Sequence, residues 1–274
     1  YPGEKISLRS ATTENVVIVD ISNGHHDVIG EMDRPSAKEL LFEKAIYIHL
    51  GTQYQVKTLD FEKRICLVES SDADYWTDSI VKRDIELLTE DSTESHSEFR
   101  LILGDILVRS QVEKYKKLRF NTHENIGYGE IWQEPEEMQT RSLMMVVDPQ
   151  SQSGKFLSQF GPELANSIVY GIANLIRQLA PAKILCDIHD IGVASRAIDP
   201  FYKSPVIYFY DMYPGGTGIA EALCSNMSGI IRSTIERIAS CPCLGGCPSC
   251  IGVENANPDT KAASLKLLNL LSCS

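Results

Sequence analysis

The stretch "IASCPCLGGCPSCIG", residues 238–252, places four of the eight cysteines of this chain within ten positions. The prolines and glycines between these cysteines favour tight turns, which let neighbouring thiolates converge on one point. Zinc binds four thiolates in a tetrahedron, and a shell made only of protein ligands is typical of a structural site. The spacing C-x-C-x3-C-x2-C therefore predicts a structural zinc site without chemistry at the metal, held by Cys241, Cys243, Cys247 and Cys250.

Two alternatives to a zinc site are a set of buried or disulfide-linked thiols and an iron–sulfur cluster. The stretch offers few apolar partners for buried thiols. The remaining cysteines are scattered in apolar surroundings, as expected of unpaired core thiols in a reducing compartment, so we expect a cytoplasmic protein. They are Cys66, Cys186, Cys224 and Cys273. An iron–sulfur cluster also takes four thiolates, and visible absorbance would distinguish it from zinc.

The composition is that of a folded globular protein, because 43% of its 274 residues are hydrophobic and 23% are charged. This length is enough for two domains. Apolar runs are all shorter than the roughly 18 residues that cross a bilayer, so we expect no membrane span. The first residue is Tyr1, which indicates a fragment or a processed chain. A net charge of −11 argues against a wholly cationic nucleic-acid binder but allows a local basic patch.

The first ninety or so residues are predicted to be mainly strands. A β-branched run covers residues 15–22, and residues 52–71 alternate around a polar turn as a hairpin does. A short helix is expected from Pro35, since proline is tolerated in the first helical turn. The N-terminal part is therefore predicted to be a small, β-rich, barrel-like domain with one helical insertion.

The stretch "LTEDSTESHSEF", residues 88–99, is acidic and rich in serine, and it shows no apolar period. Such a composition is typical of an exposed loop or a domain boundary. We therefore predict a β-rich accessory domain over residues 1–93 and a zinc-binding domain over residues 94–274.

The C-terminal half is predicted to be an α/β domain. Apolar residues recur every three or four positions from Pro162 to Leu179, which predicts an amphipathic helix. The short apolar runs at residues 182–187 and 204–211 have the pattern of strands that are buried on both faces. Further helices are expected at residues 218–240 and 257–271, the last with Asn257 as its N-cap.

Several stretches resemble superfamily 2 DNA repair helicases of the mitomycin-repair-factor type. They are "YPGGTGIAEAL" (213–223) followed by the four cysteines, "YKKLRFNTHENIGYGEI" (115–131) and "CDIHDIGVAS" (186–195). The continuation "QTRS" (139–142) departs from the threonine-rich stretch of that family. The resemblance implies that the chain is the zinc-binding region that follows two motor domains of an ATP-driven helicase. The implied partners are DNA and those motor domains.

The densest basic stretch is "EKYKKLRFNTHE", residues 113–124, which also contains Tyr115 and Phe120. Cations interleaved with aromatic rings suit the phosphates and bases of a single strand. Alternatively, side chains that alternate along a strand would place these charges on both faces of a sheet, where they would be solvated and bind nothing. Together with the resemblance, the stretch predicts weak binding of single-stranded DNA by Lys114, Lys116, Lys117, Arg119 and His123.

Other polar groups suggest further chemistry less strongly. The glycine-rich loop at residues 213–218 could approach a phosphate, but it lacks the Lys-Ser/Thr of an ATP-binding loop, and a tight strand-to-helix turn needs the same glycines. Asp187, His189, Asp190 and Asp211 could form a metal-dependent nuclease site or could cap helices and turns. We therefore predict a non-catalytic, zinc-binding accessory region of a DNA repair helicase. The alternatives are a nuclease domain and a zinc-scaffolded protein-interaction module.

Overall fold

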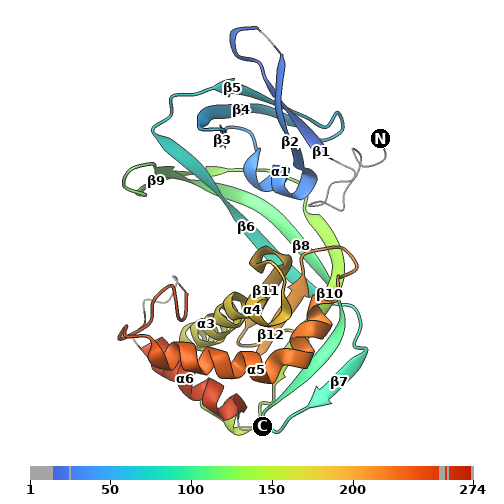
Figure 1. Cartoon of the computed structure of the whole chain (residues 1–274), viewed down its shortest axis with the longest axis vertical. Coiled ribbons are helices and arrows are strands. Elements are labelled where there is room, and N and C mark those ends of the chain that lie inside the picture. Colours follow the sequence, from blue (N-terminus) through green and yellow to red (C-terminus); the bar gives the residue numbers. More distant parts are fainter. Residues whose placement is uncertain (1–14, 25, 253–256, 258, 273–274) are drawn as a thin grey trace. The chain divides into compact units, whose positions relative to one another are not determined.

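The computed structural model describes residues 15–24, 26–252, 257 and 259–272 (Figure 1). The chain forms two compact units, each made of two separate segments. Unit 1 comprises residues 1–84 and 109–137, and unit 2 comprises residues 85–108 and 138–274. The strands β6 (Tyr75–Leu87), β8 (Phe99–Arg119) and β10 (Glu136–Val147) contain residues of both units. The predicted boundary at residue 93 divides the chain into two continuous stretches, whereas each of these units is made of two segments. That residues 1–93 and 94–274 fold independently stays a prediction.

Unit 1 contains a five-stranded sheet in the order β2-β1-β5-β4-β3. Its strands are β1 (Asn15–Asp20), β2 (Asp27–Asp33), β3 (Ile46–His49), β4 (Thr52–Asp60) and β5 (Ile65–Ser70). The strands β1 and β5 pair in parallel, whereas the other neighbours are antiparallel. Register shifts in β1 and β4 increase the local twist, as bulges do, and the sheet curls into a half-barrel. The predicted hairpin and the barrel-like N-terminal part are confirmed.

The helix α1 (Arg34–Leu40) follows β2 directly, and its start is fixed by a side-chain cap. The carboxylate of Asp33 accepts a hydrogen bond of 3.0 Å from the backbone N–H of Ser36, and Pro35 occupies the first turn. Apolar residues after the helix, including Phe42, enter the core of unit 1 with Ile18 and Val56. The helix α1 therefore confirms the predicted helical insertion in the β-rich part.

Two short strands pair with β8. The strand β9 (Asn125–Glu130) pairs with its C-terminal end, which belongs to unit 1. The strand β7 (Ser92–Ser95) pairs with its N-terminal end, which belongs to unit 2. All four residues of β7 are exposed, so the stretch that the composition predicts to be a loop does lie at the surface but contains an edge strand.

The sheet of unit 2 places β12 (Val206–Asp211) between β10 and β11 (Ile191–Arg196), and both pairings are antiparallel. Every residue of β12 is buried. Ile207 and Phe209 face the helical core, whereas Tyr208 and Tyr210 belong to a second apolar cluster with Met144. This alternation confirms that the apolar run at residues 204–211 contains a strand buried on both faces, which begins at Val206.

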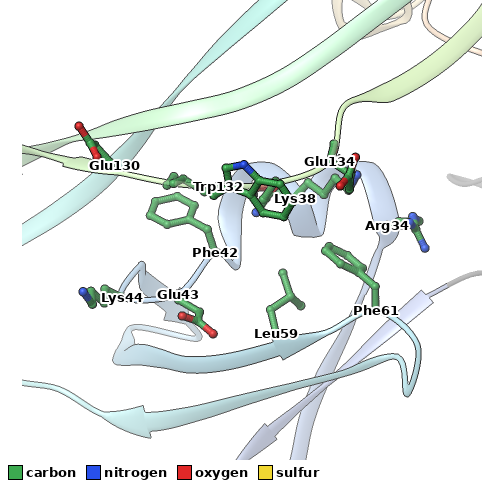
Figure 2. A pocket seen from close by; sticks show the side chains of 12 residues that line it. Arg34, Lys38, Phe42, Glu43, Lys44, Leu59, Phe61, Glu130, Trp132 and Glu134 are labelled. Carbon is green, nitrogen blue, oxygen red and sulfur yellow. Dashed lines mark hydrogen bonds between the residues drawn. The ribbon is translucent and has the colours of Figure 1, made fainter.

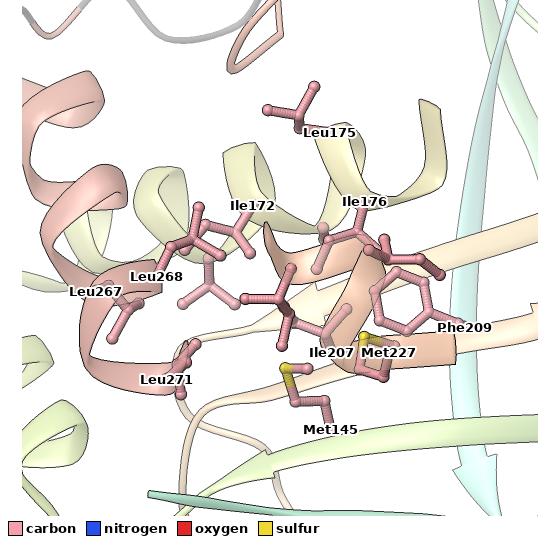
Figure 3. Close-up of a cluster of buried hydrophobic side chains, with 14 of the residues drawn as sticks. Met145, Ile172, Leu175, Ile176, Ile207, Phe209, Met227, Leu267, Leu268 and Leu271 are labelled. Atoms are coloured by element: carbon pink, nitrogen blue, oxygen red, sulfur yellow. The ribbon is translucent and has the colours of Figure 1, made fainter. Parts of the chain in front are cut away.

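Helices cover one face of this sheet. They are α2 (Gln152–Leu157), α3 (Pro162–Leu179), α5 (Ile219–Ser240) and α6 (Asp259–Ser272), and α3, α5 and α6 contact one another. Figure 3 shows Ile207 and Phe209 of the sheet beside Ile176 of α3, Met227 of α5 and, further along, Leu271 of α6. The three long helices that the sequence predicts are therefore confirmed. No helix among the described residues is long and apolar enough to cross a membrane.

The strand predicted at residues 182–187 is wrong. Helical backbone continues past α3 into α4 (Pro181–Ile184), because the N–H groups of Lys183 and Ile184 bond to the carbonyl of Ala180. Leu185 then takes a left-handed conformation, with φ of 54°, and is 93% exposed. The apolar run is therefore a helical turn and its exit. The neighbouring strand is β11 instead, which follows the short 3-10 helix η3 (Ile188–Asp190).

Candidate metal centre and its surroundings

The four predicted metal ligands converge between α5 and α6. Their sulfur atoms all lie within 4.8 Å of one another. Cys241 Sγ lies 3.5 Å from Cys243 Sγ and 3.6 Å from Cys247 Sγ. Cys250 Sγ lies 3.5 Å from Cys243 Sγ and 3.7 Å from Cys247 Sγ. The structure thus brings together all four residues that the spacing singles out.

These distances fit one zinc ion. Ligands about 2.3 Å from a central ion stand about 3.8 Å apart at the corners of a tetrahedron, close to the sulfur separations found here. A disulfide would need a separation of about 2.05 Å, and the four cysteines are free thiols. A cluster of several iron atoms would push its ligands further apart than a single ion does. The four cysteines therefore form a zinc site, and the complete protein shell makes it a structural one.

The backbone of the cysteine loop turns sharply around Cys247. The carbonyl of Cys247 accepts hydrogen bonds from the N–H groups of Cys250, Ile251 and Gly252, at 3.0, 3.1 and 3.3 Å. Gly246 has a φ of 128°, and a Cβ there would lie 2.1 Å from the side chain of Ile251. A residue with a side chain would be strained at this position, so this glycine is required by the turn.

Three side chains fasten the cysteine loop to the helices. Ile251 is fully buried and packs in the helical core. The ammonium of Lys261, in α6, donates to the carbonyls of Cys241 and Cys243, at 2.7 and 2.6 Å. The guanidinium of Arg237, in α5, donates to the carbonyl of Ser249 at 3.1 Å. A zinc ion with four thiolates carries a net charge of −2, so both cations also offset the charge of the site. Sequence reasoning misses this support because Lys261 and Arg237 lie outside the cysteine motif.

Hydrogen bonding and burial have opposite effects on two of the thiols before a metal ion binds. The backbone N–H of Cys243 lowers the pKa of Cys241 to about 7. Burial raises the pKa of Cys250 to about 12. Zinc binds thiolates, so its binding has to release the proton from Cys250. The site therefore binds zinc in competition with protons.

The glycine-rich loop at residues 213–218 is organised by a buried carboxylate. Asp211 is fully buried at the end of β12, and its carboxylate accepts from the N–H of Thr217 at 2.8 Å and the N–H of Ala220 at 3.3 Å. Gly216 has a φ of 81°, and a Cβ there would lie 2.5 Å from Cβ of Arg141. The loop is therefore a tight strand-to-helix turn, as the sequence favours, and the N–H groups of Thr217 in the loop and of Ala220 in α5 already bond to the chain itself.

The candidate nuclease carboxylates have structural partners as well. Asp187 and Asp190 form a reciprocal capping box around η3, and Asp190 also accepts from the hydroxyl of Tyr213 at 2.9 Å. His189 bonds to Asp187 at 2.7 Å. Among the described residues, the cysteine cluster is the one group of potential ligands close enough to share an ion. The geometry thus favours caps and turns over metal-dependent hydrolysis.

The predicted DNA-binding residues lie on the hairpin formed by β8 and β9 in unit 1 (Figure 1). Lys116 stands opposite Tyr128 in the ladder, and the ammonium of Lys117 lies 5.3 Å from the ring centre of Tyr75. Tyr115 is buried against Phe42, so it is closed to bases. Lys114 and Arg119 are exposed on β8, and His123 is exposed in the turn after it.

Comparison with known proteins adds a family to this geometry. Residues 172–251, which include all four cysteines, match the family model of the MrfA Zn-binding domain. The chain is 37% identical over 273 residues to the ATP-dependent helicase YprA of Bacillus subtilis. This match covers 99% of the chain and 36% of YprA. It is 25% identical over 272 residues to the ATP-dependent helicase HRQ1 of Saccharomyces cerevisiae, covering 93% of the chain and 24% of HRQ1.

A solved structure matches the same length of chain. The crystal structure of the DUF1998 helicase MrfA bound to DNA superposes with a TM-score of 0.73 and 37% sequence identity. The match covers 99% of this chain and 36% of the helicase. The chain thus spans about a third of the length of YprA and of that crystallised helicase.

Proposed function

We propose that this chain, which belongs to the C-terminal regions of MrfA-type helicases and contains the MrfA Zn-binding domain, is a non-catalytic accessory region of an ATP-dependent DNA helicase. In this proposal the parent protein acts in DNA repair in the cytoplasm, and its motor domains lie outside this chain. The observation that carries the proposal is the match of nearly the whole chain to a DNA-bound helicase of the same type.

The zinc site has a structural role in the proposed region. Zinc fixes the loop between α5 and α6, where Lys261 and Ile251 join it to the helical core. When bound, the ion supplies four strong bonds to a loop that has few apolar contacts of its own. The four thiolates would take all four coordination positions of the ion, so no position would remain for a substrate.

Single-stranded DNA is the proposed ligand of the β8–β9 hairpin. The exposed cations Lys114 and Arg119, together with Lys116, would contact phosphates. The net charge of −11 repels a polyanion at long range, so this basic face attracts DNA only at short distance and low ionic strength. Binding by this chain alone should therefore be weak and strongly dependent on salt.

Fluorescence anisotropy of a labelled oligonucleotide tests the proposed DNA binding. We expect the affinity to fall steeply between low and moderate salt, because each neutralised phosphate releases counterions. The double variant Lys116→Ala/Lys117→Ala should weaken binding equally for different sequences, since phosphates carry no sequence information. The double variant Lys155→Ala/Lys183→Ala, which removes two exposed lysines of unit 2, is the matched control.

Three outcomes would contradict the proposed function. They are no binding at low salt, affinity that is independent of salt, and affinity that both double variants leave unchanged. ATP turnover that copurifies with the chain would contradict its non-catalytic role, because the sequence has no G-x-x-x-x-G-K-[ST] loop to hold the phosphates.

A further inference from the structure

A hollow in unit 1 lies between α1, the end of β4 and the segment that joins β9 to β10 (Figure 2). Its volume is about 430 Å³. The apolar part of its lining includes Phe42, Leu59 and Phe61, and Trp132 lies across from them. The hollow thus combines aromatic rings with an opening to solvent, although no motif in the sequence indicates a site here.

Trp132 is 83% exposed, which is unusual for so large an apolar side chain. The segment that carries it is nevertheless held on both sides. The N–H of Ile131 bonds to the carbonyl of Glu113 at 2.9 Å, and the buried ammonium of Lys38 donates to the carbonyl of Glu134 at 2.8 Å. Gln133 in turn donates to the carbonyl of Lys38 at 3.3 Å. The indole is therefore displayed from a fixed backbone.

The β8–β9 ladder leads towards this indole. Lys116 stands opposite Tyr128, and Lys114 stands opposite Glu130. Side chains that are directly opposite in a ladder share a face, and every second residue of a strand returns to that face. Tyr128, which is 61% exposed, therefore lies on the same face as the two lysines. Trp132 lies two residues beyond the end of β9, beside the hollow.

The charges around the hollow select against a phosphate inside it. Three cations (Arg34, Lys38 and Lys44) and three carboxylates (Glu43, Glu130 and Glu134) line it, so their charges cancel. Arg34 and Lys38 are also engaged within the chain. Glu136 accepts from Arg34 Nε at 3.0 Å and from Lys38 Nζ at 2.7 Å. The guanidinium of Arg34 lies 4.9 Å from the ring centre of Phe61. A neutral planar group is therefore the best match for this lining.

We propose that Trp132 and the hollow beside it bind an unstacked nucleobase of a single DNA strand whose phosphates follow Lys114 and Lys116. Base stacking on an aromatic ring is tolerant of sequence, because every base has a π-face. The neutral lining accepts the base, and the lysines of the ladder meet the backbone. This inference rests on the proposed DNA-binding function and adds the position and chemistry of a base site.

The intrinsic fluorescence of Trp132 provides a direct test. The chain has two tryptophans, Trp76 and Trp132, so Trp76→Phe leaves the indole of interest as the sole reporter. Titration of the full chain with an oligothymidylate at low salt should quench this emission. An abasic oligonucleotide of the same length, which keeps the phosphates but has no bases, should leave it unchanged. The same titration of the wild type and of Trp132→Phe is a second comparison, in which Trp76 is kept. The quenching seen in the wild type should be lost in this variant.

Affinity measurements separate this inference from the proposed function. By anisotropy, Trp132→Ala should lose about fivefold or more in affinity for the oligothymidylate, as expected for one lost stacking contact. Phe201→Ala, which removes an exposed aromatic ring of unit 2, should lose nothing. DNA binding with unchanged Trp132 emission would overturn the base site alone and would favour a partner protein there. Equal quenching by the abasic strand would overturn it as well. If the wild-type chain fails to bind DNA at low salt, the proposed function fails, and the base site fails with it.

Discussion

Two loops of similar composition flank α5 and are held in place by different means. The loop before the helix, residues 213–218, and the loop after it, residues 241–250, are both rich in glycine and contain proline. In the first loop, the buried carboxylate of Asp211 accepts hydrogen bonds from the loop and from the first turn of α5. In the second, four thiolates converge without any central group from the chain. The first loop is therefore completed by its own sequence, whereas the second needs an ion.

The difference follows from the donors and acceptors that each loop contains. The N–H and hydroxyl of Thr217 in the first loop point inward, and one carboxylate satisfies both of them together with the N–H of Ala220 in α5. The second loop directs sulfur atoms inward instead, with separations of 3.5 to 3.7 Å along four of their pairs, and all four can be deprotonated together only when a cation lies between them. Removing the metal should thus affect only the second loop, and removing the carboxylate only the first.

The largest expected effect comes from Cys247→Ser. Structural zinc contributes roughly 10 kcal/mol or more to folding in small zinc modules, so loss of one ligand should unfold at least the C-terminal end and make the protein poorly soluble. Elemental analysis should find one zinc ion per wild-type chain and much less in the variant. Cys224→Ser is the control, because Cys224 lies in α5 away from the cluster, and its zinc content should equal that of the wild type. A zinc-free wild-type chain, or one that is brown and contains iron, would contradict the assignment.

The next largest effect is expected for Asp211→Ala. It removes the acceptor of two backbone N–H groups and of the Thr217 hydroxyl, at a fully buried position. A hydrogen bond to a charged acceptor contributes about 1.5–3 kcal/mol, and the N–H of Ala220 is buried whereas Thr217 is exposed to water, so the free energy of unfolding should fall by about 3 kcal/mol. Chemical denaturation measures this loss. The zinc content should stay at one per chain, and a variant that loses its zinc would show that the two loops are not independent.

How much the sequence predicts differs between these two loops. The cysteine site is predictable, because ligand type, number and spacing all lie within ten residues. The turn at residues 213–218 is predictable from its glycines. The burial of Asp211 cannot be seen in the sequence, so a nuclease site stays there as a less favoured alternative to a cap or turn. The strand wrongly predicted at residues 182–187 has the same origin, since a short apolar run does not distinguish a helical turn from a strand.

Contacts between distant segments are out of reach for sequence reasoning. Lys261 reaches Cys241 across 20 residues, and Lys38 reaches Glu134 across 96. The sequence around Trp132 predicts neither the exposure of its side chain nor the hollow beside it. Such features depend on how elements pack, and they have no local signal in one sequence.

A smaller effect is expected when the support of the cysteine loop is removed and its ligands are kept. Lys261→Met keeps the length of the side chain but loses charged hydrogen bonds to two carbonyls, a change of about 1.5–3 kcal/mol. Zinc should therefore leave the variant faster when a colorimetric chelator competes for it. Lys266→Met is the control, since Lys266 lies in the same helix near the ring of Phe156 and not near the loop. Equal rates in all three proteins would show that the thiolates alone hold the loop.

The smallest effect concerns a third loop, between β11 and β12, which is also held by a carboxylate. Burial alone would raise the pKa of Asp199, but hydrogen bonds from the Tyr208 hydroxyl, from the N–H groups of Tyr202 and Phe201, and from Arg196 outweigh it and lower the pKa. A lowered folded-state pKa stabilises the protein above the unfolded pKa of about 3.9, and this stability is lost as pH falls through the folded pKa.

Unfolding of the wild type and of Asp199→Asn at pH 6 and at pH 3 measures this effect. The difference in their free energies of unfolding should be larger at pH 6 than at pH 3. Zinc loss in acid affects both proteins alike and cancels in the comparison. A difference that stays constant or grows in acid would mean that the ionised carboxylate does not support this loop.

Hydrogen exchange of the wild-type chain before and after zinc removal by a chelator shows whether only one of the two loops depends on the ion. We expect faster exchange at the amides that turn around Cys247, those of Cys250 to Gly252, and unchanged protection at Thr217 and Ala220. Such a result would show that one loop depends on the ion and the other on its own carboxylate. Unchanged exchange around Cys247, or equal loss of protection in both loops, would show that the two loops are not held by different means.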